Sequence, residues 1–358
     1  MSALGRIQAL SGVVVGASVF LIPSVRKRIL SMLGGYISWK TVAILLAILN
    51  FKNLPFVWHL RIFTTMYYQI FIQRTKITPQ MLFNPVITTT RSPLAECDYN
   101  GHKSNSTYFS DLDEARTGLV SAILRRGIRN SGKQLEMPID QYREAVGKPD
   151  LKEIPKGMFK MALGAVSCHF RREVQPYQKV EIWTRLLAWD RKWLYWVSHI
   201  VEAGTVKPAS YSLQPWKKGR GQKEETAQET QERIAKAKKA VLAVSVAKYV
   251  VKKGRLTIPP ELVLQNSEML PPKPRSAPPA ANIAVYSKAS ELSPPVAIDS
   301  TDESLFPSTN EEWTWERVEA ERLKGLKFAE HFAALDALLD TFDGEGPVMG
   351  KWRDIYSI

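Results

Sequence analysis

A carboxylate, a short polar loop and a helix start follow one another in this chain, and together they could perform chemistry. The loop reads DYNGHKSNSTY over residues 98–108, after an apolar, strand-like run at 83–97 and before a helix-like run at 108–126. The first N–H groups of a helix lack intrahelical acceptors and carry partial positive charge. Such donors can stabilise an oxyanion while Asp98 acts as a base or a nucleophile. Cleavage of a thioester requires both of these functions.

A purely structural interpretation of the same loop is also open. Asp, Asn, Gly and Ser are common in turns and helix caps, so residues 98–108 could serve only to connect a strand to a helix. Gly101 would let the loop turn tightly in either case, because glycine tolerates positive φ. Local composition alone therefore indicates a candidate site without deciding its function.

A longer pattern supports the catalytic interpretation. The spacing D-x-x-G-H-x-x-N-x-x-Y at 98–108, followed by D-E-A-R at 113–116, resembles the hotdog-fold acyl thioesterases. Within them, the chain is most similar to the membrane-tethered thioesterase-like group that includes fungal thioesterases of secondary-metabolite pathways. The resemblance covers roughly residues 82–262. Many members have Asn-Asn where this chain has Asn105-Ser106, which leaves no second Asn side chain at the helix start.

The resemblance implies a role for each residue of the loop. In the family, the Asp that corresponds to Asp98 attacks the thioester carbonyl or activates a water molecule. Backbone N–H groups at the start of the central helix, here around Asn105 and Ser106, hold the carbonyl oxygen. His102 would hydrogen-bond within the loop or contact the thioester. The candidate substrate-binding residues are Gly101, Tyr108 and Glu114, the last also being a possible second carboxylate.

Three functions remain open at this point. The first is hydrolysis of an acyl thioester carried by coenzyme A or a carrier protein, in the biosynthesis of a fungal polyketide or lipopeptide. The second is a hotdog hydratase or dehydratase, which would rely on a His with a carboxylate; the order around His102 matches the thioesterases better. The third is a non-catalytic, membrane-tethered acyl-binding protein, which would have no need of Asp98 facing a helix start.

The charge balance indicates the kind of partner. The formal net charge is +14, yet the chain has no helix-turn-helix, zinc-finger or RNA-recognition motif, so nucleic acid is not expected as a partner. Anionic membrane surfaces, or the phosphates of coenzyme A or a phosphopantetheine carrier, fit better. No cofactor is expected, and no Cys or His cluster has metal-ligand spacing. Cys97 and Cys168 both lie in apolar runs and are expected to be buried thiols in a reducing compartment.

The N-terminal region is predicted to associate with a membrane. Residues 7–25 form a run of 19 residues without a charge, close to the roughly 20 apolar residues that cross a bilayer. The basic residues 26–28 follow directly, which would place the rest of the chain in the cytosol, at the endoplasmic reticulum or another endomembrane. A cleaved signal peptide is the alternative, but the run is long and basic residues occupy the position of a cleavage site.

A second apolar stretch, at 41–51, is only 11 residues long. Its length favours an interfacial helix with Trp39, Trp58 and the Tyr67-Tyr68 pair at headgroup level. The alternative is a second membrane span, which would move the following domain across the membrane. We therefore expect a single-pass protein whose catalytic domain faces the cytosol.

The central region is predicted to be α+β. Apolar residues recur at helical spacing in 108–126, and apolar and polar residues alternate at 162–170, 180–186, 194–201 and 241–251. A strand, a long helix and several antiparallel strands follow in the order of the hotdog fold, in which a sheet wraps around the helix. Hotdog domains commonly pair with their sites at the interface, so the resemblance also implies a homodimer.

The chain divides into four predicted regions. They are an N-terminal membrane anchor with interfacial helices (1–80), a hotdog domain (81–265) with a charged insertion at about 217–239, a Pro/Ser-rich linker (266–310), and a C-terminal amphipathic helix (311–358). The apolar stripe of the last helix consists of Phe328, Phe332, Leu335, Leu339 and Phe342. This helix is expected to pack on its own domain, with a partner or membrane contact as the alternative.

Overall fold

The computed structural model describes residues 38–130, 139–154, 159–221, 225–274, 313–341 and 349. The predicted anchor at 7–25 lies outside these residues, as do most of the predicted linker and Phe342. Within the described ranges, none of the helices combines the length and the apolar character that crossing a bilayer needs.

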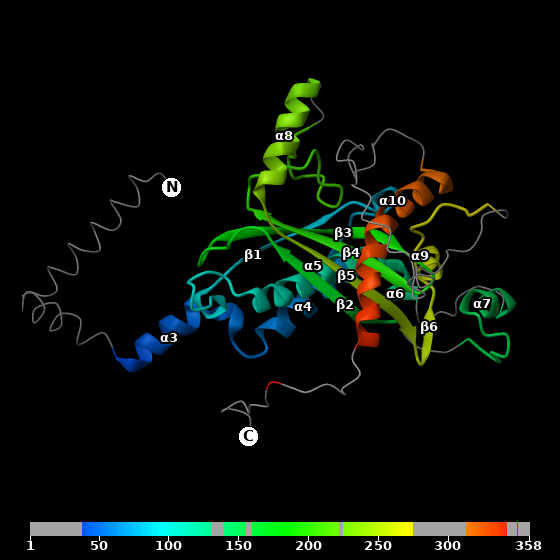
Figure 1. The fold of residues 1–358 in the computed structure, drawn as a ribbon, viewed down its shortest axis with the longest axis horizontal. Coiled ribbons are helices and arrows are strands. Elements are labelled where there is room, and N and C mark those ends of the chain that lie inside the picture. The colour runs from blue at the N-terminus through cyan, green and yellow to red at the C-terminus, as the bar shows by residue number, and fades with distance from the viewer. Residues whose placement is uncertain are drawn as a thin grey trace, which may run out of the picture.

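A single antiparallel sheet wraps around one long helix, which confirms the predicted α+β hotdog architecture (Figure 1). Its strands are β1 (Val86–Arg91), β2 (Lys160–Phe170), β3 (Lys179–Trp189), β4 (Trp193–Glu202), β5 (Val241–Lys253) and β6 (Leu256–Ile258). The order is β1-β3-β4-β5-β2, and β6 pairs with β5. The enclosed helix is α5 (Tyr108–Ile123), whose Leu112 and Leu119 are fully buried against the inner face of the sheet.

Two predicted elements end earlier than the sequence pattern indicated. The strand-like run at 83–97 is a strand only as far as Arg91, because Pro93 lacks the N–H that a ladder needs and a 3₁₀ turn, η4 (Leu94–Glu96), follows. Asp98 therefore comes after a turn and not directly at a strand end. The predicted helix at 108–126 divides at Leu124, beyond which the chain continues as a separate helix, α6 (Arg125–Asn130).

A hairpin at 189–193 joins β3 to β4. β3 and β4 pair from Val180↔Glu202 to Trp189↔Leu194, so the chain reverses at Asp190. The Asp190 carboxylate accepts hydrogen bonds from the backbone N–H groups of Lys192 and Trp193, both at 2.6 Å. These bonds stabilise the turn that sets the register of the two central strands.

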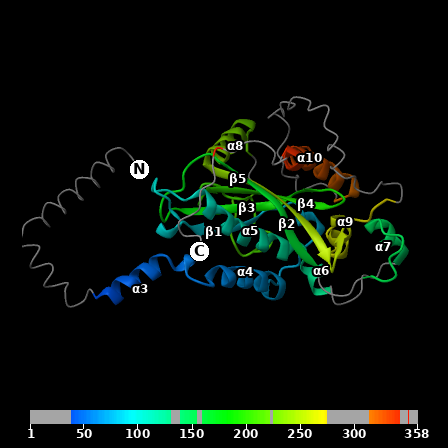
Figure 2. The same ribbon diagram turned by 60° about the horizontal axis from the view of Figure 1, so that its bottom comes forward.

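An N-terminal arm of short helices packs on α5 from the side opposite the sheet. The arm consists of α3 (Trp39–Leu49), η1 (Phe51–Asn53), α4 (Val57–Tyr67) and η2 (Tyr68–Ile72). In Figure 2, α4, α5, the sheet and α10 follow one another as layers. Gly118 of α5 faces Thr65 of α4 in this contact, and a Cβ there would lie 3.4 Å from the Thr65 side chain, an ordinary van der Waals distance. The domain boundary predicted at residue 80 separates α4 from α5, although these two helices pack against each other.

The outer face of the sheet is covered by the C-terminal helix α10 (Trp315–Ala333), so this helix packs on its own domain. The predicted apolar stripe is wrong as the packing face, because Phe328, Leu335 and Leu339 are 37%, 53% and 80% exposed. Val318 and Ala329 of α10 are fully buried. A Cβ at Gly325 would lie 1.9 Å from the carbonyl oxygen of Leu187, so only glycine allows the helix to approach β3 this closely. Arg322 also donates to the Trp189 carbonyl at 2.8 Å.

The remaining elements surround this core. They are η3 (Pro79–Met81), α7 (Ile139–Val146), α8 (Ala227–Ala240) within the predicted charged insertion, α9 (Pro260–Asn266) and η7 (Ala334–Thr341). Thr226 and Glu229 form a capping box that fixes the start of α8. Cys97 and Cys168 are free, half-buried thiols, and burial raises the pKa of Cys168 to about 11.

Candidate active site

The loop that carries Asp98 is a tight turn held by its own backbone. Asp98 N–H donates to the carbonyl of His102 at 3.0 Å, and Gly101 N–H donates to the carbonyl of Asp98 at 3.0 Å. Gly101 has a φ of 76°, the left-handed conformation expected for it. One oxygen of the Asp98 carboxylate accepts the N–H of Asn100 at 2.9 Å. The side chain is thus held in place and keeps its other oxygen for chemistry.

The Asp98 carboxylate is accessible and lies beside an imidazole. Its side chain is 25% exposed, and its Oδ1 is 3.8 Å from Nδ1 of His102. Nε2 of His102 is also 3.8 Å from a carboxylate oxygen of Glu173. These separations are too long for hydrogen bonds, so His102 is not bonded to either carboxylate in this conformation.

The loop leads into a helix start whose N–H groups face no capping side chain. η5 (Asn105–Thr107) directly precedes α5, and its N-cap residue, Ser104, makes no side-chain capping bond. The Ser104 hydroxyl lies 3.1 Å from that of Ser106. Asn105 and Ser106 are both exposed, so their N–H groups can serve as donors to an oxyanion. The structure therefore places Asp98, Gly101, His102, Asn105 and Ser106 in one accessible loop.

The two other candidate residues lie elsewhere. Tyr108 is only 3% exposed, its ring packs edge-on against Phe170 with centroids 4.9 Å apart, and burial raises the pKa of its hydroxyl. Glu114 forms an ion pair with Arg61 of α4 and so faces the N-terminal arm. Burial raises the pKa of the Glu114 carboxyl although Arg61 opposes this effect. Tyr108 is the first residue of α5, directly after the loop turn, and Glu114 lies further along the same helix.

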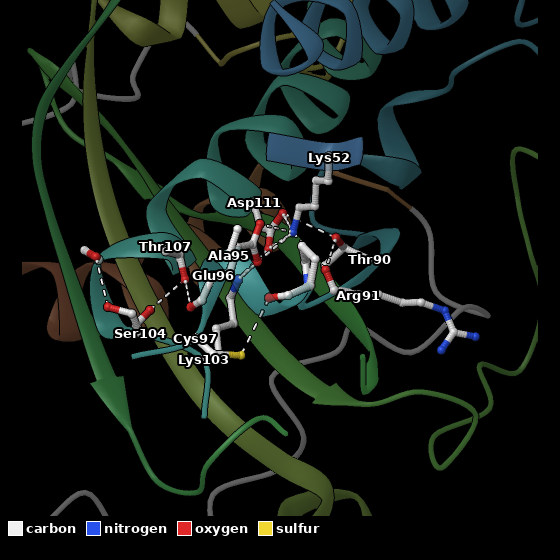
Figure 3. A network of polar contacts seen from close by, with 12 residues as sticks. Lys52, Thr90, Arg91, Ala95, Glu96, Cys97, Lys103, Ser104, Thr107 and Asp111 are labelled. Atoms are coloured by element: carbon white, nitrogen blue, oxygen red, sulfur yellow. Dashed lines mark hydrogen bonds and ion pairs between the residues drawn. The ribbon is translucent and has the colours of Figure 1, made fainter. Parts of the chain in front are cut away.

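Sequence reasoning missed a largely buried cluster of charges beside the loop, of which Figure 3 shows Lys52, Glu96, Lys103 and Asp111. Its members are the cations Lys52, Arg61 and Lys103 and the carboxylates Glu96, Asp111 and Glu114. Lys52 lies 2.8 Å from Glu96 and 2.7 Å from Asp111, and Lys103 pairs with the same two carboxylates. We call this set the six-charge cluster. It ties the arm, the loop and α5 to one another.

Comparison with known proteins establishes the family. Residues 92–253 match the model of the Thioesterase-like superfamily. The chain is 34% identical to the thioesterase poxG of Penicillium oxalicum over 323 residues, covering 88% of this chain and 90% of that protein. It is 33% identical to the probable thioesterase atnL of Emericella nidulans, covering 86% and 89%. The chain belongs to the thioesterase-like superfamily. It is accordingly a thioester hydrolase of hotdog fold.

A further relative shows how far the similarity of this thioesterase-like chain extends. The thioesterase lcsJ of Purpureocillium lilacinum is 30% identical over 336 residues, covering 86% of this chain and 94% of that protein. This coverage exceeds the 92–253 range of the family model, so the similarity includes much of the chain outside the hotdog core.

Electrostatics in the six-charge cluster are set by burial and by the paired charges. Burial favours the neutral form of Asp111, but Lys52 and Lys103 outweigh it and the pKa of the carboxyl is lowered. Burial lowers the pKa of Lys52 although Asp111 opposes this. Asp111 also accepts a hydrogen bond from Thr90 at 3.3 Å. The pairing inside the cluster thus keeps a carboxylate ionised in a position where water is scarce.

Proposed function

We propose that this thioesterase hydrolyses an acyl thioester carried on the phosphopantetheine arm of coenzyme A or of a carrier protein, with Asp98 as the reacting carboxylate. The observation that carries the proposal is the accessible Asp98 side chain in a loop that ends at the exposed amides of Asn105 and Ser106. A carboxylate and an oxyanion site within one short loop are suited to a carbonyl substrate.

The arrangement permits two routes to the same products. In the first, Asp98 attacks the carbonyl carbon, the C–S bond breaks to release the thiolate, and water hydrolyses the resulting anhydride. In the second, Asp98 takes a proton from a water molecule that attacks the carbonyl directly. In both, the amides of Asn105 and Ser106 stabilise the oxyanion, and the leaving thiolate gains a proton. His102 would contact the thioester, because its ring stands too far from Asp98 for a hydrogen bond.

Two alternatives are less well supported. A hydratase would need His102 as its base with a carboxylate to orient it, whereas the His102 and Asp98 side chains stand 3.8 Å apart. A binding protein would not need an accessible carboxylate beside a helix start. We further propose that the substrate is an acyl intermediate of fungal secondary metabolism, such as a polyketide or lipopeptide chain, in keeping with the fungal relatives.

A thioester panel tests the reaction. The full-length protein, purified in mild detergent, should release free thiol from aliphatic and aromatic acyl-CoA and from the matching carrier-protein thioesters. Colorimetric detection of the thiol gives kcat and KM for each. Hydration of an enoyl-CoA without thiol release would support the hydratase, and saturable acyl-CoA binding without turnover would support the binding protein.

We also propose a homodimer formed along β2. Among the described strands, β2 pairs on one side only, with β5, and so presents an unpaired edge. Leu163 and Phe170 of β2 are 44% and 40% exposed, which gives this edge apolar side chains to bury. Pairing with a second β2 would extend the sheet across a two-fold axis. A monomeric mass in light scattering at working concentrations would contradict this.

The N-terminal arm is suited to a membrane surface. All residues of α3 escape burial, and Leu60 and Phe63 of α4 are 59% and 58% exposed. Residues 1–95 contain no Asp or Glu, so the side chains of this region do not repel an anionic lipid surface. We propose that the arm lies in the headgroup region of a bilayer, that residues 7–25 cross it once, and that the hotdog domain faces the cytosol.

Tryptophan quenching tests where the arm lies. In full-length protein reconstituted into vesicles with brominated lipids, Trp39 and Trp58 should be quenched because both are on the exposed arm. The change of both to Phe should remove most of the quenched emission. The matched control is Trp183→Phe, because Trp183 neighbours the inward-facing Ile182 and so lies on the opposite, outer face of the sheet. Equal quenching in the arm variant and its parent would contradict the proposal.

A further inference from the structure

The Lys52 side chain connects two parts of the molecule that are far apart in sequence. Lys52 lies in η1, between α3 and α4, and its ammonium reaches the turn that precedes the Asp98 loop (Figure 3). Its Nζ is 2.9 Å from the carbonyl oxygen of Arg91, 2.8 Å from Glu96 and 2.8 Å from Asp111. Only 15% of the side chain is exposed. The ammonium has therefore exchanged most of its water for these acceptors.

Glu96 transmits this anchoring to the loop. Its carboxylate accepts from Lys52 and from Lys103. Its backbone carbonyl accepts from the N–H of Ser104 at 2.8 Å and from the hydroxyl of Thr107 at 3.3 Å. Glu96 thus lies just before the reacting carboxylate and is bonded to the segment that carries the oxyanion donors. A displacement of Glu96 would move the two reacting parts of the loop relative to each other.

A second contact from the arm reaches the same turn. Asn50, which caps the C-terminus of α3, accepts the N–H of Ala95 with its side-chain oxygen at 2.8 Å. On the far side of the loop, Lys103 N–H donates to the carbonyl of Val174 at 2.9 Å. The loop is therefore held on one side by the hotdog domain and on the other by residues 50 and 52 of the arm.

Charge balance makes the lysine necessary. The six-charge cluster contains three cations and three carboxylates, and Glu96 is only 2% exposed. Without Lys52, three carboxylates would share Lys103 and Arg61, and Glu96 would keep Lys103 as its one cationic partner within the described residues. A buried carboxylate that loses a partner must draw in water or move. Either response would loosen the loop from the position it now holds.

We propose that Lys52 is a positioning residue for thioester hydrolysis: through Glu96, it holds the Asp98 loop in its reactive geometry. The inference rests on the proposed function, since it takes Asp98 and the amides of Asn105 and Ser106 as the reacting groups. The arm then does more than attach the enzyme to a membrane. It supplies a side chain without which the active loop of the hotdog domain is incomplete.

Lys52→Met tests this in the full-length protein, assayed with whichever acyl-CoA of the thioester panel turns over fastest. Methionine keeps most of the apolar stem and removes the charge. We expect kcat to fall by about 10- to 100-fold, because small misplacements of reacting groups can cost on the order of 10²-fold. KM should stay within about twofold, since the lost contact acts on the transition state and not on substrate binding. Lys52→Arg, which keeps the charge, should restore most of kcat.

Two matched variants separate positioning from general destabilisation. Arg61→Met removes another cation of the six-charge cluster, one that pairs with Asp111 and Glu114 but does not contact Glu96. It should lower stability comparably and leave kcat within about twofold. Lys40→Met removes an exposed lysine of α3 and should change neither. All variants are compared at a temperature at which circular dichroism shows them folded.

Each outcome decides the proposal. A folded Lys52→Met with the parent kcat, or a kcat that falls equally in Arg61→Met, would overturn it. If Lys52→Met does not fold, Asn50→Ala is measured in its place, since it removes the second contact between the arm and the same turn. A several-fold lower kcat in Asn50→Ala supports the inference, and an unchanged kcat overturns it. Asp98→Asn is assayed in parallel. Full activity in Asp98→Asn would mean that the active site itself has been misassigned, which is a different failure.

Discussion

Replacement of Asp98 by Asn is expected to abolish most thioester hydrolysis while leaving the fold intact. The amide has nearly the same shape, and its oxygen can still accept the N–H of Asn100, as the carboxylate does at 2.9 Å. It has neither the negative charge nor the basicity that both routes require. Loss of a general base typically costs about 10²–10⁴-fold in rate. The measurement is kcat on the thioester panel, with circular dichroism to confirm folding.

His102→Ala provides the comparison for this result. His102 approaches Asp98 no closer than 3.8 Å, so the change should reduce kcat less than Asp98→Asn does. Turnover that persists unchanged in a folded Asp98→Asn protein would remove the carboxylate from the reaction. An equal loss in His102→Ala, together with hydration of enoyl-CoA by the parent, would favour the hydratase.

Much of the hotdog core could be predicted because its elements bury one regular face. Alternation placed Ile182 inward in β3, and helical spacing placed Leu112 and Leu119 inward in α5; all three are buried as expected. The motif at 98–108 located the candidate loop because its glycine turn and helix start are local features. Local patterns determine local geometry, and this loop is built almost entirely from neighbours in sequence.

The six-charge cluster could not be predicted in the same way. Lys52 reaches Glu96 across 44 residues and Asp111 across 59, and no periodicity links such positions. In the sequence, Lys52 is merely the residue that ends an apolar stretch, while Glu114 resembles any exposed acid of a helix. Only the packing of the arm against α5 and the loop brings these residues into one cluster. The fold of the hotdog domain could thus be predicted from sequence, whereas the ion pairs that hold its candidate loop depend on tertiary packing.

Asp111→Asn is expected to have the largest effect on stability. Asp111 is 2% exposed and lies within 3.1 Å of Lys52, Lys103 and Arg61. Removal of one partner from a buried ion pair typically costs about 3–5 kcal/mol, because the remaining charges stay buried without compensation. Urea unfolding of the detergent-solubilised protein, followed by near-UV circular dichroism, measures this. The control is Asp140→Asn, whose exposed pair with Arg143 should contribute about 0–1 kcal/mol.

The pH dependence of the stability difference between the parent and Asp111→Asn shows whether the charge of Asp111 causes that difference. The pKa of Asp111 is lowered in the folded state, so its contribution to stability is fully present above the ordinary carboxyl value of about 3.9. It is lost as the pH falls through the lower folded value, where Asp111 takes up a proton and resembles asparagine. The parent should therefore exceed Asp111→Asn in stability most at neutral pH, and the two should converge in acid. A difference that stays constant from neutral pH into acid would show that shape, and not the charge of Asp111, stabilises this part of the protein.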